Sequence, residues 1–89
     1  MAKRSKLEII RDILYIILDN NKSIKLTPLL RKSNLSSTRF YEYYNELMTK
    51  DFIVEIKDDK GKLVKITDKG KRFLDKYRTI IDFIDEFEL

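Results

Sequence analysis

Residues 27–48 read TPLLRKSNLSSTRFYEYYNELM, and this stretch decides the fold. Thr27 offers a capping hydroxyl before Pro28, a residue favoured at the first position of a helix. A brief helix is therefore expected from Pro28 to Lys32 or Ser33. The Asn-Leu pair that follows predicts a tight turn.

A longer helix is expected after the turn, over residues 36–49. Ser36 and Ser37 offer its cap, and large apolar side chains recur at helical spacing, so one face is expected to be buried. That face consists of Phe40, Tyr44, Leu47 and Met48. Two short helices joined by so tight a turn predict a helix-turn-helix.

Another helix is expected before this motif, from about Lys6 to Asp19. Ser5 and Glu8 have the spacing of a capping box, and an apolar stripe follows them. The stripe consists of Leu7, Ile10, Leu14 and Ile17. A short extended segment over residues 23–26 leads from this helix to the helix-turn-helix.

Two strand-like runs, Phe52 to Lys57 and Lys62 to Thr67, follow the helix-turn-helix. Gly61 lies between them and can adopt the positive φ that a tight hairpin turn requires. The runs alternate, so one face of the hairpin is expected to be buried and the other wet. In the first run, Phe52, Val54 and Ile56 alternate with Ile53, Glu55 and Lys57.

The last helix is expected from about Asp68 to Glu88, with Thr67 as its cap. Its apolar residues have the heptad spacing of a coiled-coil seam, which predicts a homodimer interface. The interface residues are Phe73, Tyr77, Ile80, Ile81, Ile84 and Phe87. A helix of about 30 Å is longer than the body needs for its own core. The alternative is that this helix folds back against the first one.

The order of helix, short strand, helix, turn, helix, hairpin and helix is that of a winged helix. The expected fold class is α+β, mainly α: a winged helix-turn-helix with a long C-terminal dimerisation helix. Residues 1–68 are expected to form the head and residues 69–89 the dimerisation helix.

The composition excludes several kinds of chemistry. The 89 residues include neither His nor Cys, so zinc sites built from them, thiol or histidine catalysis and disulfides lack their atoms. The acidic pairs, such as 58–59 and 85–86, are expected in a turn and on an exposed helix face. We expect no enzyme activity, no cofactor, no metal site and no small-molecule ligand. The longest apolar run, residues 13–18, is too short to span a membrane, so a cytoplasmic protein is expected.

The net charge of +4 is unevenly divided along the chain. Residues 1–72 hold 17 basic and 10 acidic side chains, whereas residues 73–89 hold two basic and five acidic ones. The body is therefore net +7 and the tail net −3. A basic body can bind a polyanion, while the acidic tail can pair with a second copy.

The run ITDKGKRFLDKY at residues 66–77 closes the hairpin and opens the long helix. It resembles the C-terminal part of small archaeal winged-helix DNA-binding proteins, and the whole chain resembles their ten-kilodalton nucleoid-associated family in element order. The resemblance implies a nucleoid-associated dimer in which the last helices form an antiparallel coiled coil and present two DNA-binding heads.

In a helix-turn-helix the second helix enters the major groove, so helix 36–49 is expected to read DNA and hairpin 52–67 to act as the wing. Arg39 suits a guanine edge or a phosphate, Asn45 suits adenine, and hydroxyl groups suit phosphates. The wing lysines are Lys57, Lys60, Lys62 and Lys65. The other candidate residues are Thr27, Arg31, Lys32, Ser36, Ser37, Thr38, Tyr41 and Glu42.

Glu42 and Glu46 oppose nonspecific binding by this helix, because a carboxylate is repelled by phosphate. Glu42 can instead accept a hydrogen bond from a cytosine amino group, which would give sequence preference. Two readings of DNA binding therefore stay open, a transcriptional regulator and an architectural chromatin protein. A winged helix that docks a protein partner without DNA is the alternative function.

Overall fold

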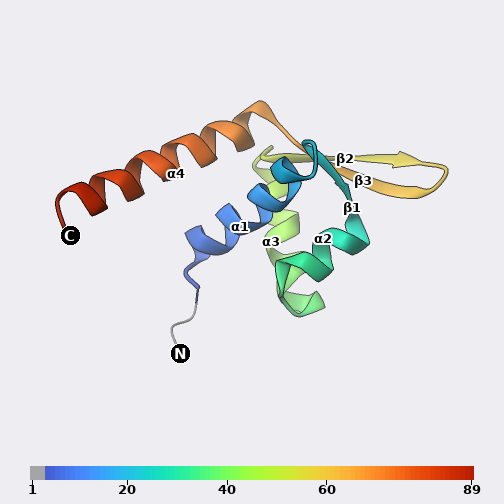
Figure 1. The fold of residues 1–89 in the computed structure, drawn as a ribbon. Coiled ribbons are helices and arrows are strands. Elements are labelled where there is room, and N and C mark those ends of the chain that lie inside the picture. Colours follow the sequence, from blue (N-terminus) through green and yellow to red (C-terminus); the bar gives the residue numbers. More distant parts are fainter. Residues whose placement is uncertain (1–3) are drawn as a thin grey trace.

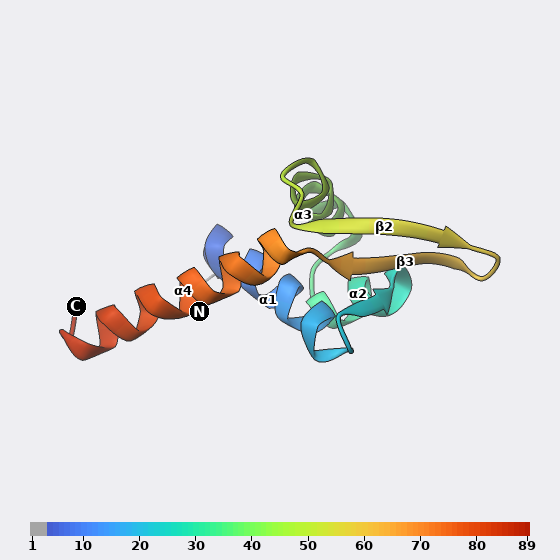
Figure 2. The same cartoon turned by 90° about the horizontal axis from the view of Figure 1, so that it is seen from above.

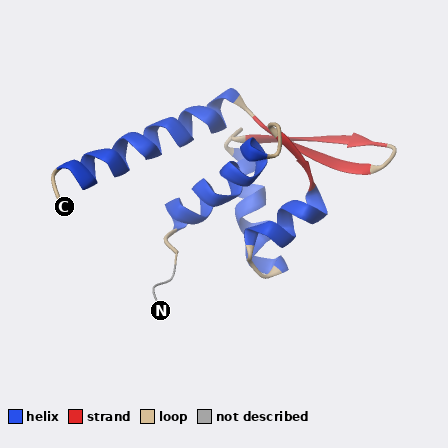
Figure 3. Cartoon of the chain, viewed as in Figure 1, coloured by secondary structure: helices blue, strands red, loops and turns tan. Residues whose placement is uncertain are grey.

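The computed structural model describes residues 4–89 and has the predicted fold class, an α+β winged helix-turn-helix (Figures 1 and 3). Seven elements follow the predicted order. They are α1 (Lys6–Asp19), β1 (Ser23–Lys25), α2 (Leu26–Ser33), α3 (Ser37–Thr49), β2 (Ile53–Asp58), β3 (Gly61–Ile66) and α4 (Asp68–Glu86). In the described residues, no helix combines the length and the apolar character needed to cross a membrane.

The core lies between the first three helices and one face of the sheet. Its fully buried side chains come from α1, α2, α3 and both long strands, with Leu74 added from α4. They include Ile9, Ile13, Leu14, Ile17, Leu29, Phe40, Leu47, Ile53 and Val64. The expected stripe of α1 is wrong at one position, because Leu7 is 53% exposed at the start of the helix.

The sheet has the strand order β1-β3-β2, with both pairs antiparallel. Ile53 and Glu55 face the helices together with Val64, while Val54 and Ile56 are 42% and 43% exposed. The alternation was therefore predicted correctly, but the more apolar set of β2 lies on the wet face. The deciding factor is register: Ile53 pairs with Ile66, whose face packs on the helices.

The start of α2 differs from the prediction. The helix begins at Leu26, directly after β1, and Lys25 is its N-cap residue without a side-chain capping bond. Thr27 consequently lies in the first turn of α2 and does not cap it. The turn after α2 is as expected, because Asn34 adopts the left-handed conformation (φ 60°) that ends the helix.

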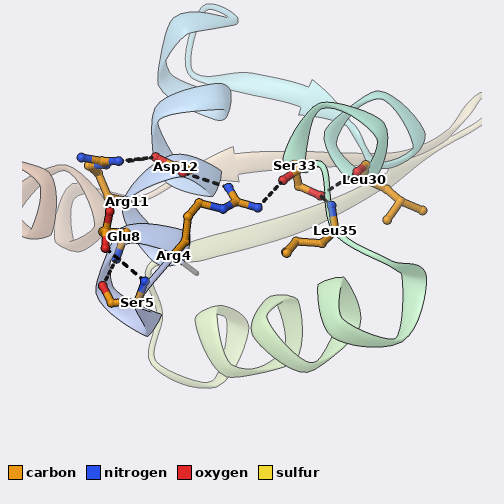
Figure 4. Close-up of polar contacts among 8 residues, drawn as sticks. All are labelled: Arg4, Ser5, Glu8, Arg11, Asp12, Leu30, Ser33 and Leu35. Carbon is orange, nitrogen blue, oxygen red and sulfur yellow. Dashed lines mark hydrogen bonds and ion pairs between the residues drawn. The ribbon is translucent and has the colours of Figure 1, made fainter. Parts of the chain in front are cut away.

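A clamp at the N-terminus holds α1 against α2 (Figure 4). Arg4 donates to the Asp12 carboxylate over 2.9 Å and to the Ser33 carbonyl oxygen over 3.1 Å. Ser5 and Glu8 form the predicted capping box immediately after it. The clamp thus joins the start of α1 to the carbonyl end of α2, where positive charge is favourable.

Helix α4 lies along the body with its first half and extends beyond it with its second (Figure 2). Gly70 and Leu74 are buried, and the Arg11 guanidinium lies 5.2 Å from the centre of the Tyr77 ring. The distal half projects away from the body, on the side opposite the hairpin. The helix ends at Glu86, two residues before the expected Glu88.

Gly70 allows the close approach of α4 to the strand before it. A Cβ atom at this position would overlap the carbonyl oxygen of Phe52 and would lie 2.8 Å from Cγ1 of Ile66. Glycine is therefore required here by space and not by a positive φ.

Candidate nucleic-acid interface

Helix α3 presents a fixed set of residues to solvent because its opposite face is locked in the core. Ser36 caps the helix by accepting from the backbone N–H of Arg39 over 3.3 Å. Phe40 is fully buried and stacks on Tyr44, with ring centres 5.5 Å apart. The residues expected to contact DNA, Ser36, Ser37, Thr38, Arg39, Tyr41, Glu42 and Asn45, are all exposed.

One flank of α3 faces the hairpin and carries no charge. Tyr44 at its edge donates its hydroxyl hydrogen to the Glu55 carboxylate of β2, and Tyr41 meets the Tyr44 ring edge-on. Ser37, Tyr41 and Asn45 lie one turn apart on this side, and we call them the wing-side flank. Hydroxyl and amide groups therefore line the side of α3 nearest the sheet.

The other flank of α3 holds the acidic residues. Glu46 accepts from Lys6 of α1 over 2.8 Å and from Lys50 over 2.9 Å. These two ammonium groups lower the pKa of the Glu46 carboxyl below its ordinary value, and Glu46 in turn raises the pKa of Lys6. The charge of Glu46 is thus compensated locally by two lysines.

Glu42 lies beside this cluster and is not compensated in the same way. It lines a shallow hollow with Lys6, Tyr43 and Glu46. It forms no ion pair with any residue in the described range 4–89. Arg39 lies one turn before Tyr43 and Glu42, on the same acidic side of the helix. Of the two acidic residues predicted to disfavour DNA, Glu46 is paired with lysines, whereas Glu42 has no ion-pair partner among residues 4–89.

The hairpin divides its lysines between two faces. Lys57 and Lys62 are directly opposite each other, on the face that also carries Glu55 and therefore faces α3. Lys60 lies in the turn, where its backbone N–H donates to Asp58 over 2.8 Å. Lys65 pairs with Ser23 and Val54 on the reverse face, so the structure separates it from Lys62.

The candidates on α2 are only partly near this surface. Thr27 and Arg31 are exposed and one turn apart, on the same face of the helix. Lys32 lines a separate hollow with Ile16, Asp19 and Asn20, at the end of α1. Lys32 is thus directed toward α1, away from the exposed face of α3.

Sequence reasoning missed the role of Glu55. The alternating pattern indicated only that Glu55 lies in a strand, whereas the structure places its side chain on the wing face that is directed toward α3, in contact with Tyr44. A signal was present in Tyr44, because a tyrosine on the buried face of a helix needs a hydrogen-bond partner for its hydroxyl. Burial and the bond to Glu55 together raise the pKa of Tyr44, so the hydroxyl stays protonated and remains a donor.

The sequence profile of the winged helix-turn-helix family matches residues 3–85, nearly the whole chain. The chain belongs to this family. The membership agrees with the resemblance carried by residues 66–77. Among proteins with curated functions, none matches this winged helix-turn-helix chain closely enough to count as a relative.

Solved structures with the same fold include archaeal and viral winged-helix proteins. Sso10a-2, described as a DNA-binding protein from Sulfolobus solfataricus, is 19% identical, with 96% of this chain and 86% of that chain covered and a TM-score of 0.77. F93 from STIV, described as a winged-helix DNA-binding protein, is 16% identical, with 89% and 91% covered and a TM-score of 0.76. The F-93 protein of SSV1 is 25% identical, with 96% and 99% covered and a TM-score of 0.67.

Proposed function

We propose that this winged helix-turn-helix protein binds double-stranded DNA, with α3 in the major groove and the β2–β3 hairpin as its wing. The observation that carries the proposal is that the uncharged wing-side flank lies on the side of α3 nearest the sheet, while Lys57 and Lys62 lie on the hairpin face that is directed toward α3. Polar groups that can read base edges and lysines that can neutralise phosphates then face the same side. The fold that this chain shares with Sso10a-2 and F93, which are described as DNA-binding proteins, supports it.

Within this arrangement each group has a role that its chemistry permits. Asn45 suits an adenine edge, while Ser37, Thr38 and Tyr41 suit phosphate oxygens. Arg39 suits a guanine edge or a phosphate at the entrance of the groove. Lys60 and Lys62 contribute phosphate contacts from the wing, and Arg31 adds one from α2.

Glu42 gives the interface a means of discrimination. Its uncompensated carboxylate repels phosphate but can accept from the amino group of cytosine. Sequence-dependent binding is therefore the better account of α3, and it favours a transcriptional regulator. The other role that DNA binding permits is that of an architectural chromatin protein in the nucleoid. A dimer with two DNA-binding heads favours this role.

We propose further that the protein is a homodimer through α4, with residues 1–68 as the head and 69–89 as the dimerisation helix. The distal half of α4 exposes Ile80 and Phe83 by 55% each and Phe87 by 57%, which is costly for a helix left in water. A second copy of the same helix would cover this surface. Among residues 4–89, Arg78 and Ile81 at the start of the distal half still line a hollow with Arg11 and Tyr15 of α1, while the end of the helix projects away from the body.

The charges of α4 favour an antiparallel pairing. Residues 68–78 hold five basic and two acidic side chains, whereas residues 79–89 hold four acidic and no basic ones. An antiparallel pair places the basic half of one helix beside the acidic half of the other, and a parallel pair opposes like charges. A hollow lined by Phe52, Lys69, Arg72, Phe73 and Lys76 is available to the acidic end of the second copy.

A fluorescence titration of a labelled random duplex over a series of salt concentrations tests DNA binding. We expect the logarithm of the binding constant to fall linearly with the logarithm of the salt concentration, by about 0.9 for each phosphate neutralised. Genomic fragments compared at fixed salt then measure sequence preference. Absence of binding at the lowest salt would contradict the proposal and would favour the protein-interaction module.

A further inference from the structure

A continuous chain of contacts links α3 to the wing through Glu55. The Tyr44 hydroxyl donates to one carboxylate oxygen of Glu55, and the Lys62 ammonium lies 3.7 Å from the other. Tyr44 is 4% exposed, and the side chain of Glu55 is 17% exposed. The recognition helix and a wing lysine therefore share one carboxylate.

The two contacts of this carboxylate differ in strength. The Tyr44 hydroxyl is buried and needs an acceptor, so its bond to Glu55 is costly to break. The Lys62 side chain is 45% exposed, and 3.7 Å is longer than a charge-assisted hydrogen bond. Lys62 can consequently exchange Glu55 for another anion while Glu55 stays in place.

The repulsion between two wing lysines explains why a carboxylate is favourable at position 55. Lys57 and Lys62 stand directly opposite each other, and like charges in such a pair repel. Glu55 lies on the same face, two residues before Lys57 along β2, and within residues 4–89 its one ion pair is with Lys62. Of this opposed pair, Lys62 has a carboxylate partner, whereas Lys57 has none among residues 4–89.

We propose that Glu55 is a positioning residue that restrains Lys62 in the free protein and competes with DNA phosphate for it. DNA binding then requires Lys62 to give up its ion pair with Glu55, which lowers the net binding free energy that Lys62 contributes. Lys57 makes no such exchange. This inference rests on the proposed DNA binding. Glu55 thereby controls how strongly the wing contributes to the affinity for DNA.

The variant Glu55→Gln tests the competition directly. The glutamine keeps a carbonyl oxygen for Tyr44 but removes the charge that holds Lys62. We expect about threefold to fivefold tighter binding to a random duplex, the size of an exposed ion pair. The dependence of the logarithm of the binding constant on the logarithm of the salt concentration is expected to become steeper by up to about 0.9. In the unmodified protein, Glu55 takes up a cation from solution when Lys62 moves to DNA, and a neutral glutamine does not.

Asp75→Asn on α4 is the matched control, since it removes the same charge from an exposed position outside the wing. A Glu55→Gln variant that binds no more tightly than Asp75→Asn would overturn the inference. Failure of the unmodified protein to bind any duplex would instead contradict the proposed function. The two failures are therefore distinguishable in one series of titrations.

A second comparison does not depend on the folding of Glu55→Gln. Lys57→Met and Lys62→Met each remove one wing lysine from the otherwise unchanged chain. We expect Lys57→Met to weaken binding more than Lys62→Met, because only Lys62 has to leave Glu55. Equal losses, or a larger loss from Lys62→Met, would refute the competition.

Discussion

The Nζ atom of Lys6 lies 2.8 Å from Oε1 of Glu46, so the first turn of α1 is tied to the C-terminal half of α3. This contact bears on both stability and function. It fixes the acidic flank of α3 against α1 and cancels a charge that would otherwise repel DNA. The pH dependence of this contact follows from the lowered pKa of Glu46 and the raised pKa of Lys6.

For Glu46→Gln we expect a lower melting temperature than for the unmodified protein at pH 7. The folded state lowers the pKa of Glu46 below 4.5, so its stabilisation is present above the unfolded pKa and is lost as pH falls through the folded one. The difference in melting temperature should therefore vanish in acid. Thermal unfolding followed by circular dichroism between pH 3 and pH 7 measures it, with Glu42→Gln as the unpaired control.

A truncation in the core should be far more costly than the same truncation on the surface. Leu47 is fully buried on α3, and Leu47→Ala should cost about 2–5 kcal/mol of unfolding free energy. Leu7→Ala, at a position 53% exposed, should change it by less than about 0.5 kcal/mol. Denaturant unfolding measures both, and similar losses would contradict the placement of α3.

Gly70→Ala should destabilise the protein although alanine is the better helix former. The added Cβ would overlap the Phe52 carbonyl oxygen and crowd Ile66, and such overpacking costs about 1–3 kcal/mol. The gain in helix propensity is only about 1 kcal/mol. A stabilised Gly70→Ala variant in denaturant unfolding would show that α4 does not approach the strand so closely.

Arg39→Ala should weaken DNA binding while leaving the fold intact. Arg39 is exposed and contributes no core contact, so its removal should affect binding and not stability. If Arg39 contacts a base, the loss of binding free energy should be about 1–3 kcal/mol. If it contacts a phosphate, the salt slope should become smaller by about 1. The same titration distinguishes these cases. Arg78→Ala on α4 is the control for charge alone, and equal effects of both variants would remove Arg39 from the site.

Ile84→Asp should dissociate the proposed dimer. A carboxylate within the apolar seam would be desolvated without a partner, which a homodimer does not tolerate. Light scattering should then give the monomer mass of 10.7 kDa. Thr79→Asp adds the same charge outside the heptad seam of α4 and should leave the dimer unchanged. A monomeric unmodified protein at high micromolar concentration would refute the dimer itself.

The order and type of the elements could be derived from the sequence, because they depend on interactions between near neighbours. The Ser5–Glu8 capping box, the cap at Ser36 and the turn at Gly61 all involve residues within a few positions of each other. The apolar spacing of α3 likewise identified the face buried by Phe40. Which residues of α3 face solvent followed from that spacing.

Tertiary structure alone decided how those elements combine into a surface. The pairing of Ile53 with Ile66 chose the buried face of the hairpin, sent Lys65 to the reverse side and brought Glu55 to Tyr44. The neutralisation of Glu46 needed Lys6, 40 positions away along the chain. Such contacts are set by register and packing between distant segments, for which a local pattern contains no information.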